Sequence, residues 1–250
     1  MSGGRTGGAV WVTGRHPVEE LLRSGTQTAR KVLLSSAVAP EVRARIERRA
    51  AELALPCLSC TKEEWDRRTG EREGGGIAAE IAEFRYFDIE DWIPALPEAS
   101  KAFLLDGITD PQNLGAILRS ARAFSFDGVV IPADRSCPLT GAVFRASAGA
   151  AAHVPVVQVT NLVRAIERLQ EAGFWVYAAE GKGGTDLADF RPANRTAVVL
   201  GSEEKGIRRL ALEKCDGAVR IGMAPGVDSL NVSVAAGIIA YSLGRSPESR

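Results

Sequence analysis

Residues 219–243 constrain the fold more than any other part of the chain. An apolar run over residues 219–223 leads into Ala224-Pro225-Gly226, and the polar cluster Asp228-Ser229-Leu230-Asn231 then precedes an apolar segment over residues 232–243. Pro and Gly end a strand, and Ser229 or Asn231 can cap a following helix. The simplest interpretation is a strand, a turn and a capped helix. The alternative is that the loop and the free amides of the helix start also bind a ligand.

The helix expected over residues 232–243 is apolar on almost every side. A helix of this kind is buried on more than one face, either in a core or against another subunit.

Upstream of this stretch, apolar strands alternate with helices. The apolar runs predict strands at residues 102–106, 128–132, 154–159, 174–179, 197–201 and 218–223, and the segments between them predict helices at 111–125, 139–151, 161–172 and 210–214. Strands that are apolar throughout are typical of a parallel sheet covered on both faces. We therefore expect an α/β domain over residues 101–246, built on an open parallel sheet of five or six strands with helices on both faces.

Ligands of such sheets bind beyond the carboxyl ends of the strands. These ends carry Asp106-Gly107, Gly201-Ser202-Glu203 and Met223-Ala224-Pro225-Gly226. The pattern predicts a binding site there.

The N-terminal part of the chain predicts a smaller α/β domain over residues 9–85. It follows a Gly-rich tail at residues 1–8, which we expect to be disordered, and precedes a linker over residues 86–100 without clear periodicity. Strands are expected at residues 10–12, 31–34, 55–58 and 77–84, and helices at 18–22, 40–53 and 62–67. The helix over 40–53 is rich in Arg, which indicates a solvated face or, alternatively, contact with RNA phosphate.

Composition excludes several classes of protein. Lys+Arg and Asp+Glu number 31 each, so the chain has no overall basic excess for unspecific nucleic-acid binding. The N-terminus lacks a signal-peptide segment and no apolar run is long enough to span a membrane, so we expect a soluble, cytoplasmic protein without membrane partners. Cys57 and Cys60 have zinc-knuckle spacing, but no second pair completes a site, and we expect no metal.

Common nucleotide-binding and hydrolase motifs are also absent from the sequence. Gly201 and Gly206 have the glycine spacing of a P-loop, but Ile207 stands where Lys is required. No G-x-G-x-x-G follows a strand, and G-x-S-x-G does not occur. His16 and His153 have no identifiable Ser or Cys partner, and structural roles are expected for both.

Three stretches together resemble the SpoU/TrmH branch of the SPOUT methyltransferases, in the family's order and spacing. They are Asp110-Pro111-x-Asn113-Leu114-Gly115-Ala116-x-x-Arg119-Ser120-Ala121, Leu200-Gly201-Ser202-Glu203-x-x-Gly206-Ile207, and Ile221-x-Met223 with Ser229-Leu230-Asn231-Val232-Ser233-Val234-Ala235.

The resemblance extends beyond these motifs. Residues 10–18 and the small N-terminal domain resemble the family's ribosomal-protein-like RNA-binding extension. Arg208-Arg209-Leu210 and Cys215-Asp216 resemble most the members that methylate a guanosine ribose in bacterial 23S rRNA. Gly74-Gly75-Gly76 departs from the family, which often carries His-Gln-Gly there.

The resemblance implies a fold, a cofactor and an assembly that composition does not reveal. The implied fold is a deep trefoil knot at the C-terminus, the implied assembly is an obligate homodimer, and the implied cofactor is S-adenosylmethionine. The cofactor-binding positions carried over are Leu200, Gly201, Ile221, Met223 and Leu230. The catalytic positions carried over are Asn113, Arg119, Glu203, Ser229 and Asn231.

Arg119 matches the residue that the family favours as a base. A guanidinium keeps its proton at neutral pH, so we expect Arg119 to steady the developing alkoxide or a neighbouring phosphate, arriving from the other subunit. Glu203 would anchor Arg119 or the Asn113 loop, and Ser229 and Asn231 would shape the knot loop.

The resemblance implies an S-adenosylmethionine-dependent RNA 2′-O-ribose methyltransferase, with a guanosine of 23S rRNA as its expected substrate. Two alternatives remain open: a tRNA 2′-O-methyltransferase of the same family, and a non-catalytic RNA-binding factor of ribosome assembly.

Overall fold

The computed structural model describes residues 10–24, 27–70, 75–181 and 183–244. The expected tail at residues 1–8 lies outside them. Contacts within the chain divide it into two units, Met1–Arg85 with Leu139–His153, and Tyr86–Pro138 with Val154–Arg250. Residues 139–153 were expected in the second domain, whereas their contacts group them with the first unit.

The first unit is built on a four-stranded sheet with the strand order β1-β4-β2-β3. β4 pairs antiparallel with β1 and β2, and β2 pairs parallel with β3. Its elements along the chain are β1 (Val10–Thr13), α1 (Arg15–Leu21), β2 (Ala29–Ser35), α2 (Pro40–Glu52), β3 (Cys57–Cys60), α3 (Lys62–Thr69), β4 (Ile77–Ile81), α6 (Gly141–Ala146) and a 3₁₀ turn (Ala150–Ala152). The expected alternation of strands and helices is therefore present, with β3 two residues later than expected and β4 ending at Ile81.

Helix α6 belongs to this unit because it packs on β1. The Nη1 of Arg145 donates a hydrogen bond to the Oγ1 of Thr13 at 2.9 Å, and a Cβ at Gly141 would lie 2.4 Å from the Trp11 carbonyl oxygen. The expected helix over 139–151 is broken in two, since Ala148 (φ 51°) and Gly149 (φ 89°) are left-handed and end α6.

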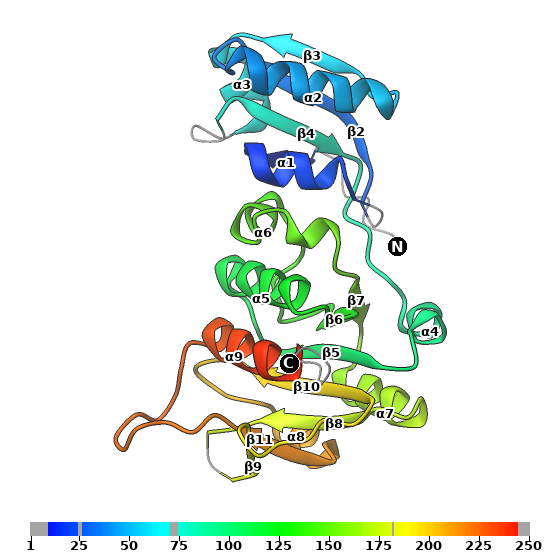
Figure 1. Ribbon diagram of the computed structural model, residues 1–250, viewed down its shortest axis with the longest axis vertical. Coiled ribbons are helices and arrows are strands. Elements are labelled where there is room, and N and C mark those ends of the chain that lie inside the picture. Colours follow the sequence, from blue (N-terminus) through cyan, green and yellow to red (C-terminus); the bar gives the residue numbers. More distant parts are fainter. Residues whose placement is uncertain (1–9, 25–26, 71–74, 182, 245–250) are drawn as a thin grey trace, which may run out of the picture. The chain divides into compact units, whose positions relative to one another are not determined.

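The second unit is built on a seven-stranded sheet with the strand order β7-β6-β5-β10-β8-β11-β9, and every pairing in it is parallel (Figure 1). Its strands are β5 (Ser100–Asp106), β6 (Gly128–Pro132), β7 (Val156–Val159), β8 (Trp175–Ala179), β9 (Thr185–Asp186), β10 (Arg195–Gly201) and β11 (Gly217–Arg220). Its main helices are α5 (Pro111–Ala123), α7 (Leu162–Glu171), α8 (Arg209–Lys214) and α9 (Val232–Gly244).

The open parallel sheet is confirmed, but the expected number of five or six strands is wrong. The strand that the sequence analysis missed, β9, has two residues, too few to form a hydrophobic pattern. β11 also ends at Arg220, three residues before the predicted end, because its partners β8 and β9 pair only with residues up to that point.

Helices cover both faces of this sheet, as predicted. Ala102 and Leu104 of β5 pack in one cluster with the inward side of α7. Side chains alternate between the two faces of a strand, so the buried Phe103 and Leu105 face the opposite side. Figure 1 shows α5 and α9 on one side of the sheet and α7 and α8 on the other.

The segment expected to be an irregular linker instead packs on the second unit. Phe87 forms a parallel bridge with Val157 beside the edge strand β7, and Asp88 caps the short helix α4 (Ile89–Trp92). Trp92 is 3% exposed and donates through Nε1 to the Asp127 carbonyl oxygen at 3.3 Å. A Cβ at Gly128 would lie 2.5 Å from its ring, so glycine is what admits the indole there.

A transmembrane helix is also not found in the described part of the chain, where every helix is too short or too polar to cross a bilayer.

Candidate active site

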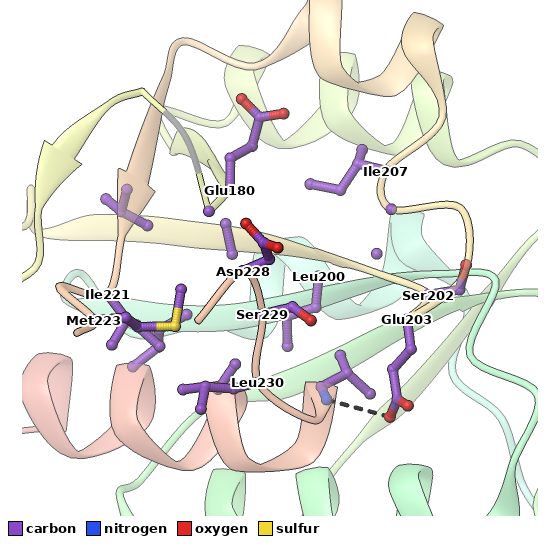
Figure 2. A pocket seen from close by; sticks show the side chains of 18 residues that line it. Glu180, Leu200, Ser202, Glu203, Ile207, Ile221, Met223, Asp228, Ser229 and Leu230 are labelled. Atoms are coloured by element: carbon purple, nitrogen blue, oxygen red, sulfur yellow. Dashed lines mark hydrogen bonds between the residues drawn. The ribbon is translucent and has the colours of Figure 1, made fainter. Parts of the chain in front are cut away.

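A pocket of about 210 Å³ opens where β8, β10 and β11 end (Figure 2). Residues at or just beyond each strand end line it, among them Glu180 after β8, Gly201 in β10 and Ile221 after β11. The remaining wall comes from the loop before α9 and from the first turns of that helix. The pocket therefore lies at the carboxyl edge of the sheet, where the sequence predicts a binding site.

The pocket has an apolar end and a polar end. Figure 2 shows Ile221, Met223 and Leu230 gathered on one side, with Ser202 and Glu203 on the other. Such an arrangement suits a ligand with one flat, apolar part and one charged part.

Glycine is required where the loop after β10 folds back on the strand. A Cβ at Gly201 would lie 2.2 Å from the carbonyl carbon of Gly206 and 2.3 Å from the amide nitrogen of Ile207. Gly206 itself has a φ of 62°, and its N–H donates to the Ser202 carbonyl oxygen at 2.8 Å. The two glycines thus allow a tight loop that brings Ser202 and Glu203 to the pocket.

Glu203 joins two segments that are far apart in the sequence. Its Oε1 accepts hydrogen bonds from the Nδ2 of Asn231 at 2.6 Å and from the Nδ2 of Asn113 at 3.2 Å. Asn231 Nδ2 also donates to the Oδ1 of Asn113 at 3.0 Å, and the Val232 amide lies 3.4 Å from the same carboxylate oxygen. Charge-assisted hydrogen bonds of this kind are among the stronger ones in proteins.

Helix capping explains how the two asparagines are placed. Asn231 is the cap of α9, since its Oδ1 accepts hydrogen bonds from the amides of Ser233 at 3.0 Å and Val234 at 3.3 Å. Asp110 caps α5 through the amide of Gln112, which leaves the Asn113 side chain free to reach Glu203. Of the two caps proposed from sequence for α9, Asn231 is confirmed, whereas Ser229 does not cap it.

Nine of the ten site residues expected from sequence meet here. The residues of that set that line the pocket are Leu200, Gly201, Glu203, Ile221, Met223, Ser229 and Leu230. Asn113 and Asn231 join it through Glu203. Arg119 does not: it lies exposed on α5 and does not line the pocket.

Glu180, Asp228 and Ile207 also line the pocket and were not singled out from sequence. Glu180 follows β8 directly, so the rule that ligands bind beyond strand ends would have found it. Asp228 stands in the polar cluster that the sequence analysis noticed. Ile207 ends the second of the three motifs, but its place in the pocket depends on how the loop after β10 folds back.

None of the four cysteines, all of which are in the described part of the chain, lines this pocket. Cys57 and Cys60 belong to β3 and are not disulfide-bonded. Burial raises the pKa of both thiols. Over the residues that the structure describes, no group of three or more His, Cys, Asp or Glu side chains is arranged to hold a metal ion.

Two family models match the chain. Residues 100–241 match the SpoU rRNA methylase family, and residues 11–87 match the RNA 2′-O ribose methyltransferase substrate-binding domain.

Curated relatives cover nearly the whole chain. A Staphylococcus haemolyticus protein assigned to the TrmH family of tRNA/rRNA methyltransferases is 39% identical over 239 residues, covering 94% of this chain and 95% of its own. An uncharacterised tRNA/rRNA methyltransferase of Mycobacterium leprae is 40% identical over 244 residues, covering 96% and 79% of the two chains.

Solved structures share the fold. The SpoU methyltransferase AviRb of Streptomyces viridochromogenes in complex with AdoMet superposes with a TM-score of 0.79 at 24% identity, over 95% of this chain and 89% of its own. An AdoMet-bound rRNA methyltransferase of Sinorhizobium meliloti superposes with a TM-score of 0.79 at 22% identity, over 94% and 87% of the two chains.

Proposed function

The chain belongs to the SpoU rRNA methylase family, and we propose that it transfers a methyl group from S-adenosylmethionine to a ribose 2′-hydroxyl of RNA. The observation that carries the proposal is the pocket at the ends of β8, β10 and β11, with Glu203, Asn113 and Asn231 tied together at its polar end. The match of residues 11–87 to a substrate-binding domain supports an RNA substrate.

The pocket residues fit S-adenosylmethionine, which supplies an activated methyl group when bound. The side chains of Ile221, Met223 and Leu230 offer an apolar surface for an adenine ring. Glu180 and Asp228 offer carboxylates that complement positive charge. A Cβ at Gly201 would clash with its own loop, so this residue keeps the loop close to the strand and the pocket narrow.

The polar residues have separate roles in this proposal. Glu203 fixes the relative positions of the Asn113 turn and the start of α9, while Ser229 and Asn231 shape the loop between β11 and α9. Orientation of this kind can supply a large part of a rate enhancement, because the entropy cost of aligning the reacting atoms is met on binding.

Arg119 completes the site from a second copy of the chain. We place it beside the ribose of the partner's substrate, where its guanidinium stabilises the developing alkoxide or a neighbouring phosphate. Its exposed position on α5 and its absence from the pocket of its own chain support this assignment.

The homodimer that this requires would use α9. Val234, Ile238 and Tyr241 are exposed large side chains, and their spacing of four and three residues forms one stripe on the helix. The opposite side of α9 packs against α5. We also propose that the C-terminal segment forms the deep trefoil knot of the family. Its support is the return of the chain from β11 to pack α9 beside α5 and β10.

We propose a guanosine of 23S rRNA as the substrate, and hence a cytoplasmic enzyme. The Arg208-Arg209-Leu210 and Cys215-Asp216 sequences support this choice. The two competing functions are methylation of tRNA ribose and RNA binding without catalysis in ribosome assembly.

Transfer of labelled methyl groups distinguishes these functions. The purified protein is incubated with labelled S-adenosylmethionine and, separately, with total rRNA and tRNA from cells that lack the gene. We expect label in 23S rRNA. Label in tRNA alone would show that the substrate is tRNA and not 23S rRNA. Failure to bind S-adenosylmethionine would favour the non-catalytic RNA-binding factor.

A further inference from the structure

A second cavity of about 530 Å³ adjoins the first at the carboxyl end of β5. The two cavities share part of their walls, including Ser202, Glu203 and Gly206. A molecule that enters the second cavity therefore comes within reach of the first.

A buried carboxylate at the base of this cavity holds one arginine in place. The Asp106 side chain is 1% exposed, and its two oxygens accept hydrogen bonds from the Arg208 amide at 2.8 Å and the Arg208 Nε at 2.6 Å. Removing a charge from water is costly unless hydrogen bonds compensate for it, and both oxygens are compensated here. The Arg208 guanidinium is thus fixed at its Nε.

The Nη groups of that guanidinium remain available. The Arg208 side chain is 52% exposed, and in the described part of the chain neither of its Nη atoms has a hydrogen-bond partner. A pre-oriented guanidinium with two free NH2 groups matches the geometry of a phosphate group.

Two further cations line the same cavity. Lys205 and Arg135 both contribute to its wall, and among the described residues neither forms a salt bridge. Arg135 has a φ of 58°, a conformation that costs a non-glycine residue free energy and that clusters at functional sites.

Three of the four carboxylates that line the cavity accept hydrogen bonds from other groups of the protein. Asp106 is paired with Arg208, Asp110 accepts the Gln112 amide at 3.0 Å, and Glu203 holds Asn231. Glu204 is the remaining carboxylate of the lining and is exposed. The donors that face the cavity are therefore the Nη groups of Arg208 and the cations of Lys205 and Arg135.

We propose that this second cavity binds a phosphodiester group of the RNA strand next to the target ribose, with Arg208 as the main contact. The inference rests on the proposed methylation of RNA ribose and adds the site at which the protein binds the RNA backbone. In RNA the 3′-carbon, next to the 2′-carbon, carries a phosphate. A ribose at the boundary of the two cavities would therefore have its 2′-hydroxyl near the first cavity and its 3′-phosphate near the second. Asp106 is a positioning residue, because it acts through Arg208.

The test compares Arg208→Gln with Arg209→Gln. Arg209 is the adjacent arginine, lines neither cavity and pairs with Glu213 on the surface of α8, so both changes remove one positive charge. We expect Arg208→Gln to raise KM for RNA about tenfold and to lower the dependence of RNA binding on salt by about one phosphate contact. Affinity for S-adenosylmethionine should not change, and Arg208→Lys should restore part of the RNA affinity.

Equal KM values in the Arg208→Gln and Arg209→Gln proteins would overturn the proposal, and so would loss of S-adenosylmethionine binding in Arg208→Gln alone. A second measurement does not depend on activity or on the variant's folding. Inorganic pyrophosphate should bind the unaltered protein, compete with RNA and leave S-adenosylmethionine binding unchanged. Pyrophosphate that competes with S-adenosylmethionine, or does not bind, would also overturn the proposal. If the protein methylates no RNA yet binds pyrophosphate in this way, the proposed function fails while the anion site stands.

Discussion

At the scale of single residues, Glu203 holds together parts of the site that come from different regions of the chain. Its Oε1 accepts hydrogen bonds from Asn113 and Asn231, and both asparagines orient their Nδ2 groups toward it. The arrangement depends on an acceptor at this point. A donor placed there would face two other donors.

Glu203→Gln tests this dependence, since it keeps the size of the side chain but removes the negative charge that strengthens both hydrogen bonds and leaves one acceptor oxygen instead of two. We expect kcat for RNA methylation to fall at least tenfold, because the start of α9 loses its alignment with the Asn113 turn. The matched control is Glu213→Gln on the surface of α8, which should keep full activity. Steady-state methyl transfer measures both. Unchanged kcat in Glu203→Gln would contradict the assigned role.

Arg119→Ala should abolish methyl transfer while S-adenosylmethionine still binds, because Arg119 does not line the pocket of its own chain. Calorimetry measures the binding and labelled transfer measures the activity. Arg122→Ala, three residues along the same exposed side of α5, is the control and should keep activity. Intact turnover in Arg119→Ala would remove this residue from the mechanism.

Some of these residues could be recognised from sequence and others could not. Gly201, Glu203 and Asn231 stand in motifs that mark strand ends and a helix cap, so their meeting follows from the topology of a parallel sheet. Arg208 directly follows the motif that ends at Ile207, but its orientation toward the second cavity depends on a contact with the buried Asp106. Such a contact, 102 residues away in sequence, leaves no local pattern.

At the scale of elements, α4 fixes the start of the second unit. Phe87 extends the sheet edge beside β7, and the Trp92 ring lies against Gly128 of β6. This helix was not expected from the sequence, because residues 86–100 show no periodicity and contain two prolines in addition to Trp92. The segment packs on the second unit through the buried indole of Trp92 and not through a periodic apolar face.

Trp92→Ala should therefore destabilise the protein by about 3–5 kcal/mol, the usual cost of removing a buried aromatic side chain. Trp175→Ala removes a tryptophan that is 54% exposed and should cost much less. Urea unfolding followed by circular dichroism measures both. Similar losses in the two proteins would show that the Trp92 contact is not structural.

Cys215, which directly follows α8, should make the stability of the fold depend on pH in the alkaline range. Burial, with the nearby charges of Asp216 and Glu180, raises the pKa of Cys215 to about 12. An unfolded thiol ionises near its usual pKa of 9.0, so the unfolded state releases its proton first as pH rises. The folded state is thus favoured by this group below pH 9, and that stability is lost between pH 9 and about 12.

The measurement is the urea midpoint between pH 8 and pH 11 in the unaltered protein and in Cys215→Ala. The variant should lose less stability over this range. At pH 8 the native Cys215 thiol should also react very slowly with iodoacetamide, because the thiolate is the reactive form. Equal alkaline losses in both proteins would contradict the buried-thiol account.

At the scale of the whole molecule, the proposed assembly places α9 at the interface between two copies. Ile238→Glu puts a charge in the middle of the exposed apolar stripe, and we expect it to shift the protein from dimer to monomer and to lower activity. Leu210→Glu introduces the same charge at an exposed leucine of α8 and should leave the dimer intact. Analytical ultracentrifugation measures both, and a dimeric Ile238→Glu protein would locate the interface elsewhere.

The whole-molecule properties were the least accessible from physical patterns. Apolar strands such as β5 and β10 indicate a parallel sheet, and the apolar surface of α9 indicates two-sided burial. The grouping of residues 139–153 with the first unit was not foreseen, because the close approach of Gly141 to Trp11 depends on the folded chain. A knot depends on the path of the chain, which periodicity does not record.

The central claim is methyl transfer to a ribose 2′-oxygen, and the position of the methyl group in the product tests it most directly. RNA is labelled with the purified protein and methyl-labelled S-adenosylmethionine, then hydrolysed completely in alkali. Alkaline cleavage requires a free 2′-hydroxyl, so a 2′-O-methylated nucleotide stays joined to its neighbour. The account predicts label in an alkali-resistant dinucleotide, absent when Arg119→Ala protein is used. Label released as a mononucleotide would mean methylation of a base and would contradict it.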